Sequence, residues 1–77
     1  MTIKISFKTN KEMDKFYTDF LGNMPGIVSS AGADVKNKNI VINTITSHND
    51  SFNAEKNLIN NIKQYMQDNE INYNMTV

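Results

Sequence analysis

The sequence predicts an α+β fold, a small open-faced sandwich in which two helices cover one side of a four-stranded antiparallel sheet. Three observations lead to this prediction. The hydrophobic residues change spacing along the chain in the order strand, helix, strand, strand, helix, strand. The 77 residues leave room for a single domain, placed at 1–77. The chain has no cysteine, so its core is built without disulfides or thiolate metal sites.

An alternating strand is predicted near the N-terminus, followed by a helix. The apolar residues of this strand are Ile3, Ile5 and Phe7. Thr9 and Glu12 have the spacing of a capping box, in which each residue satisfies a free backbone amide of the other. Gly22 is expected to end the helix in the left-handed conformation. The apolar stripe of this helix consists of Met13, Phe16, Tyr17, Phe20 and Leu21.

Residues 27–46 are predicted to form two strands joined by a turn at 36–39, where asparagines tolerate positive φ. The first strand, 27–35, is irregular, and Gly32 suggests a bulge or bend within it. Its shared face is expected to consist of Ile27, Ser29, Ala31, Ala33 and Val35. The second strand, 40–46, is the strongest strand signal and is apolar on both faces. Ile40 and Ile42 lie on one of these faces, and Val41 and Ile45 on the other.

A second helix and a closing strand at 71–77 complete the pattern. The predicted inner face of the helix consists of Phe52, Glu55, Leu58, Ile59, Ile62, Tyr65 and Met66. Right-handed crossovers place both helices on one side of the sheet and give the spatial strand order fourth, first, third, second. This topology resembles the ferredoxin-like fold over the whole chain, although no family motif accompanies the resemblance.

No group of residues has the pattern of a catalytic or metal site. The only histidine, His48, stands beside Ser47 and Asp50 in a predicted loop and is interpreted as a solvated turn residue. A zinc site there would lack its third and fourth ligands. The carboxylates are interpreted as capping or solvated charges. We therefore expect no enzyme activity, no cofactor and no metal.

The known functions of this topology require residues that the chain lacks. A heavy-metal carrier would have Cys-x-x-Cys where Lys8-Thr9-Asn10-Lys11 stands. An acylphosphatase-like enzyme would need an arginine, and a phosphocarrier would need a histidine in place of Asn10. An RNA-recognition motif would need aromatic residues on the open side of both central strands, where Phe7 is better explained as core.

A surface remains as the candidate for function. The uncovered side of the sheet is expected to bind a protein partner or a second copy of the chain, although strand propensity alone also explains the two-faced strand. The predicted binding residues are Lys4, Lys8, Val41, Asn43 and Ile45. The outer strand at 71–77 contains neither proline nor charge, so pairing of this edge in a homodimer, or with a partner's strand, is an alternative.

The amino-acid composition limits the classes of function that the chain is expected to have. Eight basic residues, all lysines, balance eight acids, and the absence of arginine argues against nucleic-acid binding. No leader or membrane span is predicted, so we expect a cytoplasmic protein. A composition rich in Asn, Lys and Ile is typical of AT-rich genomes such as those of low-GC bacteria and their phages. We expect a phage or mobile-element accessory protein that inhibits a host defence protein, as anti-CRISPR proteins do.

Two other functions stay open. One is a dimeric sensor domain that holds a small ligand near Thr9 and residues 23–26. The other is a weak binder of single-stranded nucleic acid that uses Lys4, Lys8 and Tyr73.

Overall fold

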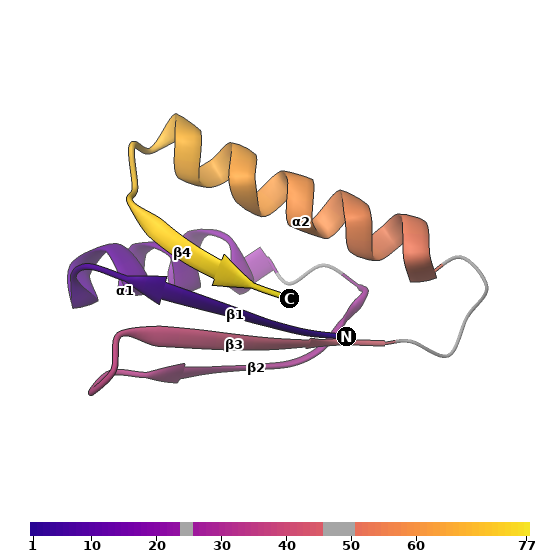
Figure 1. Cartoon of the computed structure of the whole chain (residues 1–77), viewed down its shortest axis with the longest axis horizontal. Helices are drawn as coiled ribbons and strands as arrows, with labels where there is room; N and C mark the ends of the chain where they lie inside the picture. The colour runs from indigo at the N-terminus through magenta and orange to yellow at the C-terminus, as the bar shows by residue number, and fades with distance from the viewer. Residues whose placement is uncertain (24–25, 46–50) are drawn as a thin grey trace.

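A computed structural model describes residues 1–23, 26–45 and 51–77 of the chain (Figure 1). Its elements are, in order, β1 (Thr2–Phe7), α1 (Asn10–Asp19), the 3₁₀ turn η1 (Leu21–Asn23), β2 (Val28–Asp34), β3 (Asn39–Thr44), α2 (Ser51–Asp68) and β4 (Tyr73–Thr76). The predicted β-α-β-β-α-β order and the α+β sandwich are therefore confirmed. The predicted loop residues Ser47, His48 and Asp50 lie outside the described residues.

The four strands form one antiparallel sheet in the order β2-β3-β1-β4, which is the predicted order. The central pair has Ile3 opposite Ile42 and Ile5 opposite Ile40, and all four side chains are fully buried. Both helices lie on the side of the sheet to which these residues point, as predicted (Figure 1). The edges of the sheet are β2 and β4.

The core lies between the sheet and the two helices. Its buried side chains are Ile3, Ile5, Phe7, Met13, Phe16, Leu21, Val28, Ile40, Ile42, Leu58, Ile62, Met66 and Ile71. Phe16 stacks on Phe20 with ring centroids 5.1 Å apart and meets the edge of Tyr65 at 5.5 Å. Tyr17 was predicted to belong to the apolar stripe of α1, but 37% of it is exposed.

The predicted start of α1 is confirmed, and its predicted end is wrong. The Thr9 hydroxyl oxygen accepts the Glu12 N–H at 3.1 Å, and the same hydroxyl donates to the Glu12 carboxylate at 3.0 Å. Glu12 thus bonds the Thr9 side chain, whereas a full capping box would place it on the backbone amide. At the other end, Gly22 does not have positive φ. The chain continues into η1, which buries Leu21, and Gly22 is no left-handed cap.

The bulge in β2 lies two to four residues before the predicted position. The register shifts between Val28 and Ser30, whereas Gly32 pairs regularly with Val41. The extra residue reverses the alternation of side chains at that point. Val28 therefore joins the covered side and is buried, whereas Ser29 is exposed and Ile27 is only partly buried against the core.

The turn between β2 and β3 also differs in detail from the prediction. The residue with positive φ is Lys38, at 56°, and not one of the asparagines. Asn37 instead binds back to the start of the turn, because its backbone N–H and its side-chain amide donate to the two carboxylate oxygens of Asp34 at 3.3 and 2.7 Å.

A Schellman turn ends α2 and shortens the last strand. Glu70 has φ 54°, its N–H donates to the Gln67 carbonyl at 3.2 Å, and the Ile71 N–H donates to the Met66 carbonyl at 2.9 Å. Ile71 and Met66, the two apolar positions of this motif, are both buried. Ile71 thus belongs to the helix cap, and β4 begins two residues later than the strand predicted at 71–77.

Candidate functional site

The side of the sheet opposite the helices is the candidate site, and we call it the open face. Strand pairing assigns its residues, because residues opposite each other in a sheet point to the same side. They are Thr2, Lys4 and Ser6 on β1, Asn39, Val41 and Asn43 on β3, Ser30, Gly32 and Asp34 on β2, and Asn74 and Thr76 on β4. Small polar residues predominate, so the open face is less apolar than the sequence predicted.

Hydrogen bonds across the strands organise the polar side chains of the open face. Thr2 Oγ1 donates to Asn43 Oδ1 at 2.9 Å, and Asn43 Nδ2 donates to Ser30 Oγ at 3.1 Å. Asn43 therefore links three strands, β1, β3 and β2. Nearer the hairpin, Ser6 Oγ donates to Asn39 Oδ1 at 2.9 Å. These bonds fix the orientation of two amide groups, and the surface they form is preorganised.

Val41 is the apolar centre of the open face. It lies in the central strand β3, opposite Lys4 on β1 and Gly32 on β2, and it is half-buried although no helix covers it. Gly32 adds no side chain, and a Cβ atom built there would meet nothing within 4 Å. The side chain of Val41 is therefore approachable from the β2 side, and Lys4 lies opposite it on β1.

The five predicted binding residues do not form a single ring. Lys4, Val41 and Asn43 lie together, since Lys4 pairs with Val41 and Asn43 is two residues further along β3. Ile45 follows the end of β3, where its N–H donates to the Ile27 carbonyl at 2.8 Å, and it is half-buried. Lys8 follows the opposite end of β1 and so does not border Val41. The sequence predicts that these residues share one face of the sheet, but it does not predict how far apart they lie along the strands.

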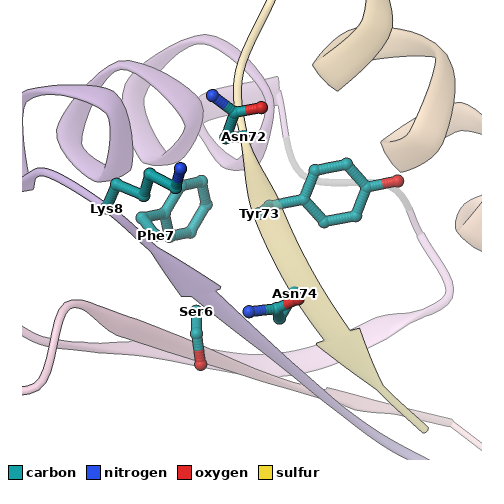
Figure 2. A pocket seen from close by; sticks show the side chains of 6 residues that line it. All are labelled: Ser6, Phe7, Lys8, Asn72, Tyr73 and Asn74. Atoms are coloured by element: carbon teal, nitrogen blue, oxygen red, sulfur yellow. The ribbon is translucent and has the colours of Figure 1, made fainter.

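Lys8 lines a polar pocket of about 250 Å³ at the end of β1 and the start of β4, which shares Ser6 and Asn74 with the open face (Figure 2). Its lining residues are Ser6, Phe7, Lys8, Asn72, Tyr73 and Asn74. Figure 2 shows the Tyr73 ring directed away from Phe7 and Lys8. The lining thus combines one positive charge, two side-chain amides and a hydroxyl group, which suits a small polar or anionic group.

One carboxylate marks the hairpin end of the open face. Hydrogen bonds from the side chain and backbone of Asn37, together with the nearby charge of Lys4, lower the pKa of Asp34 below its ordinary value. Asp34 therefore stays ionised at neutral pH. The open face carries both signs of charge, with Lys4 beside Val41 and Asp34 near the turn.

The sequence did not reveal the residues that bond Asn43, which are Thr2 and Ser30, or that Asn39 bonds Ser6. Thr2, Ser30 and Asn39 contribute to the open face as much as the predicted residues do, but they are ordinary polar residues in the sequence. Only the strand register brings Thr2 next to Asn43, which is 41 positions away. Asn39 was predicted in the turn at 36–39, and alternation carried no information about which residues would meet across the strands.

No protein-family model, curated protein or solved structure matches this chain. Within residues 1–23, 26–45 and 51–77, no group of three or more His, Asp or Glu residues is arranged to hold a metal ion. In the same part of the chain, no helix combines the length and the apolar character needed to cross a membrane.

Proposed function

We propose that this chain is a non-enzymatic protein-binding module that uses the open face as its contact surface. The observation that carries the proposal is Val41, an accessible apolar side chain at the centre of the sheet, framed by Lys4 and by the hydrogen-bonded Asn43. A central apolar contact surrounded by ordered polar groups is the usual anatomy of a protein interface. Preorganisation lowers the entropy cost of binding, because the amide groups are already oriented.

The proposed partner is a host defence protein, which the chain would inhibit by occupying its surface in the manner of anti-CRISPR proteins. The support for this part of the proposal is the composition, with lysine as the only basic residue and many asparagines and isoleucines. Such a composition is typical of AT-rich phages and low-GC bacteria, so the partner is sought among bacterial proteins.

A matched pair of valine substitutions tests the proposal. Val41→Glu places a charge at the centre of the open face, whereas Val35→Glu places the same charge in the β2–β3 turn, where Val35 is 59% exposed. Each purified variant is used as bait in the lysate of a low-GC bacterium, and the captured proteins are identified by mass spectrometry. We expect a protein that wild type and Val35→Glu retain and that Val41→Glu loses.

Circular dichroism and thermal melting of both variants provide the control. The two variants should keep the wild-type spectrum, because Val41 lies outside the helix-covered core. Unfolding of Val41→Glu would show that Val41 is a structural residue. Equal capture by all three proteins would show that the open face is not the binding surface, and either result removes the proposal.

A second candidate function rests on the polar pocket near Lys8. The pocket lies next to Thr9, where the sequence suggested a ligand-sensing site, and its lining suits a carboxylate or another small anion. A thermal-shift screen of amino acids and nucleotides tests this function. Stabilisation by one ligand class that is lost in Lys8→Gln would favour the sensor over the protein-binding module.

The geometry offers no support for nucleic-acid binding by Lys4, Lys8 and Tyr73. Tyr73 pairs with Phe7 and therefore points to the helix-covered side, whereas Lys4 lies on the open face. The three residues do not share a surface on which a base could stack and a phosphate could be bound.

A further inference from the structure

We propose that β4 pairs with β4 of a second copy of this chain, in an antiparallel arrangement about a two-fold axis at Met75. The two sheets would then form one continuous sheet, with all four helices on the same side. The inference rests on the edge strand β4, on the pattern of its side chains and on a groove between α2 and Met1. None of these features includes Val41, the centre of the proposed contact on the open face, although Asn74 and Thr76 of β4 border that face.

The outer edge of β4 is suited to strand pairing. β4 is the last strand of the sheet, and its own-chain partner β1 occupies only its inner side. The residues from Asn72 to Val77 include no proline and no charged side chain, the two devices that most often block an edge. Val77 is 67% exposed, and Tyr73 and Met75 are only partly buried against the core.

The other edge of the sheet, β2, carries such protection. A bulge between Val28 and Ser30 distorts its first half. Asp34, an ionised carboxylate, ends its second half. Bulges and charges both disfavour the addition of another strand, so β4 is the edge at which pairing is expected.

The side chains of β4 complement one another in the proposed arrangement. With Met75 on the two-fold axis, Asn74 of one copy lies opposite Thr76 of the other, and Tyr73 lies opposite Val77. The first pair joins an amide to a hydroxyl group on the open face, where they can form a hydrogen bond. The second pair joins an aromatic ring to an aliphatic residue on the helix-covered side, a favourable cross-strand combination.

A groove beside the end of β4 fits the same partner. It has a volume of about 350 Å³ and is lined by Met1, Glu55, Lys56, Ile59, Asn60 and Lys63. The start of β1 and the end of β4 are neighbours, because Lys4 pairs with Thr76 (Figure 1). The second copy's Tyr73, opposite Val77 on the helix side, would therefore lie next to the apolar part of this groove, formed by Met1 and Ile59.

The charges along the groove favour a second copy over another occupant. Glu55, Ile59 and Lys63 follow one another at four-residue spacing on one side of α2. A two-fold operation reverses the direction of this row, so the acid of one copy faces the lysine of the other with the two isoleucines between them. A row of this kind is complementary to itself.

A charge-swap pair of variants tests the interface. Asn74 and Thr76 are exposed on the open face, so lysine is tolerated there by the fold. In N74K/T76K, the lysine at position 74 of each copy lies opposite the lysine at position 76 of the other copy. In N74D/T76K, an aspartate lies opposite a lysine in both of these pairs. Both variants carry the same lysine at position 76 next to Lys4, so they differ across the interface only in the charge at position 74.

Sedimentation equilibrium from about 1 to 200 µM measures the outcome. We expect a wild-type dimer, at least tenfold weaker association of N74K/T76K, and association of N74D/T76K close to that of wild type. A monomeric wild type over this range overturns the proposal. A wild-type dimer that both variants retain equally, or lose equally, also overturns it, because the effect would not depend on charges that meet across β4.

Cysteine cross-linking gives a second test that needs no change of charge. The natural chain has no cysteine, so N74C and T76C each carry a single thiol. If the register is as proposed, a mixture of the two variants forms a cross-linked dimer with a short bismaleimide faster than either variant alone. Equal yields in all three samples would contradict the register.

The dimer would also enlarge the contact surface. A continuous sheet places the two open faces side by side, which would double the surface available to a partner, and this last consequence rests on the proposed function. The two ideas fail separately. A monomeric wild type leaves the comparison of Val41→Glu with Val35→Glu unaffected, because Val41 lies in β3 and not at the β4 edge.

Discussion

The two sides of the sheet are made from alternate residues of the same strands, yet they differ in what holds them together. In β3, Ile40 and Ile42 are fully buried beneath the helices, whereas Val41 and Asn43 between them are only half-buried. The covered side is stabilised by apolar burial. The open face is ordered by hydrogen bonds between side chains of neighbouring strands. The contrast indicates that the fold depends on the first side, while the second is available for binding.

The largest expected effect on stability distinguishes the covered side of β3 from its open side. Ile42→Ala should reduce the free energy of unfolding by about 2–5 kcal/mol, because it removes fully buried methyl groups and leaves a cavity. Val41→Ala should reduce it by less than about 1 kcal/mol, since much of that side chain already contacts water. Urea denaturation of both variants checks the difference. Equal losses would mean that the open face is covered in solution.

A smaller effect is expected in the helix layer that covers the sheet. The Tyr65 hydroxyl donates to Asp19 Oδ2 at 3.1 Å and so joins α2 to α1. Burial, together with the hydrogen bond and charge of Asp19, raises the pKa of Tyr65 to about 12. Tyr65→Phe should cost about 1 kcal/mol.

The pH dependence of Tyr65 provides an independent check of this contact. The folded-state pKa lies above the ordinary value of 10.0, so the contribution of the neutral phenol is complete below pH 10 and is lost as the pH rises toward 12. Ultraviolet titration of the phenolate checks the shift, and Asp19→Asn should reduce it. A midpoint for Tyr65 at its ordinary value would contradict the contact.

The turn that ends α2 offers a stabilising substitution. Glu70 has φ 54°, in the left-handed region, where a side chain is unfavourable and glycine is not. Glu70→Gly should raise the free energy of unfolding by about 0.5–1 kcal/mol. The greater entropy that glycine gives to the unfolded chain reduces this gain. Thermal melting measures the change. Because Lys38 also has positive φ, Lys38→Gly in the β2–β3 turn is the matched control at a site outside the helix layer.

On the open face, the hydrogen bond between Thr2 and Asn43 should give a small coupling energy. A double-mutant cycle with Thr2→Val and Asn43→Ala is expected to yield about 0.5–1 kcal/mol, typical of an exposed cross-strand pair. Equilibrium denaturation of the four proteins supplies the values. A coupling energy as large as the Ile42→Ala effect would show that the open face stabilises the fold as strongly as the covered side does.

The smallest expected effect concerns Asp34. Its folded-state pKa lies below the ordinary value of 3.8, so its contribution to stability is present above that pH and is lost as the pH falls below it. Carboxyl-carbon NMR titration should locate the midpoint below 3.8, and Asn37→Ala should move it upward. No upward movement would show that the Asn37 side chain is not the main cause of the lowered pKa.

Several elements of the fold were predictable because the signals that specify them are local. Thr9 and Glu12 are three residues apart, and the predicted N-cap at Thr9 is formed, although Glu12 binds the Thr9 hydroxyl and not its backbone amide. The apolar residues of β1, Ile3, Ile5 and Phe7, alternate with polar ones, and they are buried as that alternation requires. The strand order also followed, since short connections and right-handed crossovers leave few arrangements of these elements.

The predictions failed where a single residue adopts an unusual backbone conformation that its residue type does not reveal. The bulge before Ser30 reverses the phase of β2, and any small residue in that segment could have formed it. The left-handed residues are Lys38 and Glu70, although neither has the preference for that region that Asn or Gly has. In both cases the packing of the flanking strands or helix outweighs a local preference of about 1 kcal/mol.

By itself, the sequence determined the order of the elements, the covered side of the sheet and most residues of the core, because spacing along the chain decides which side chains share a face. The tertiary structure alone decided which polar residues meet on the open face. The Thr2–Asn43 and Ser6–Asn39 contacts join positions 41 and 33 residues apart. Their existence depends on the register of β1 against β3, which packing of the covered side fixes and local sequence does not encode.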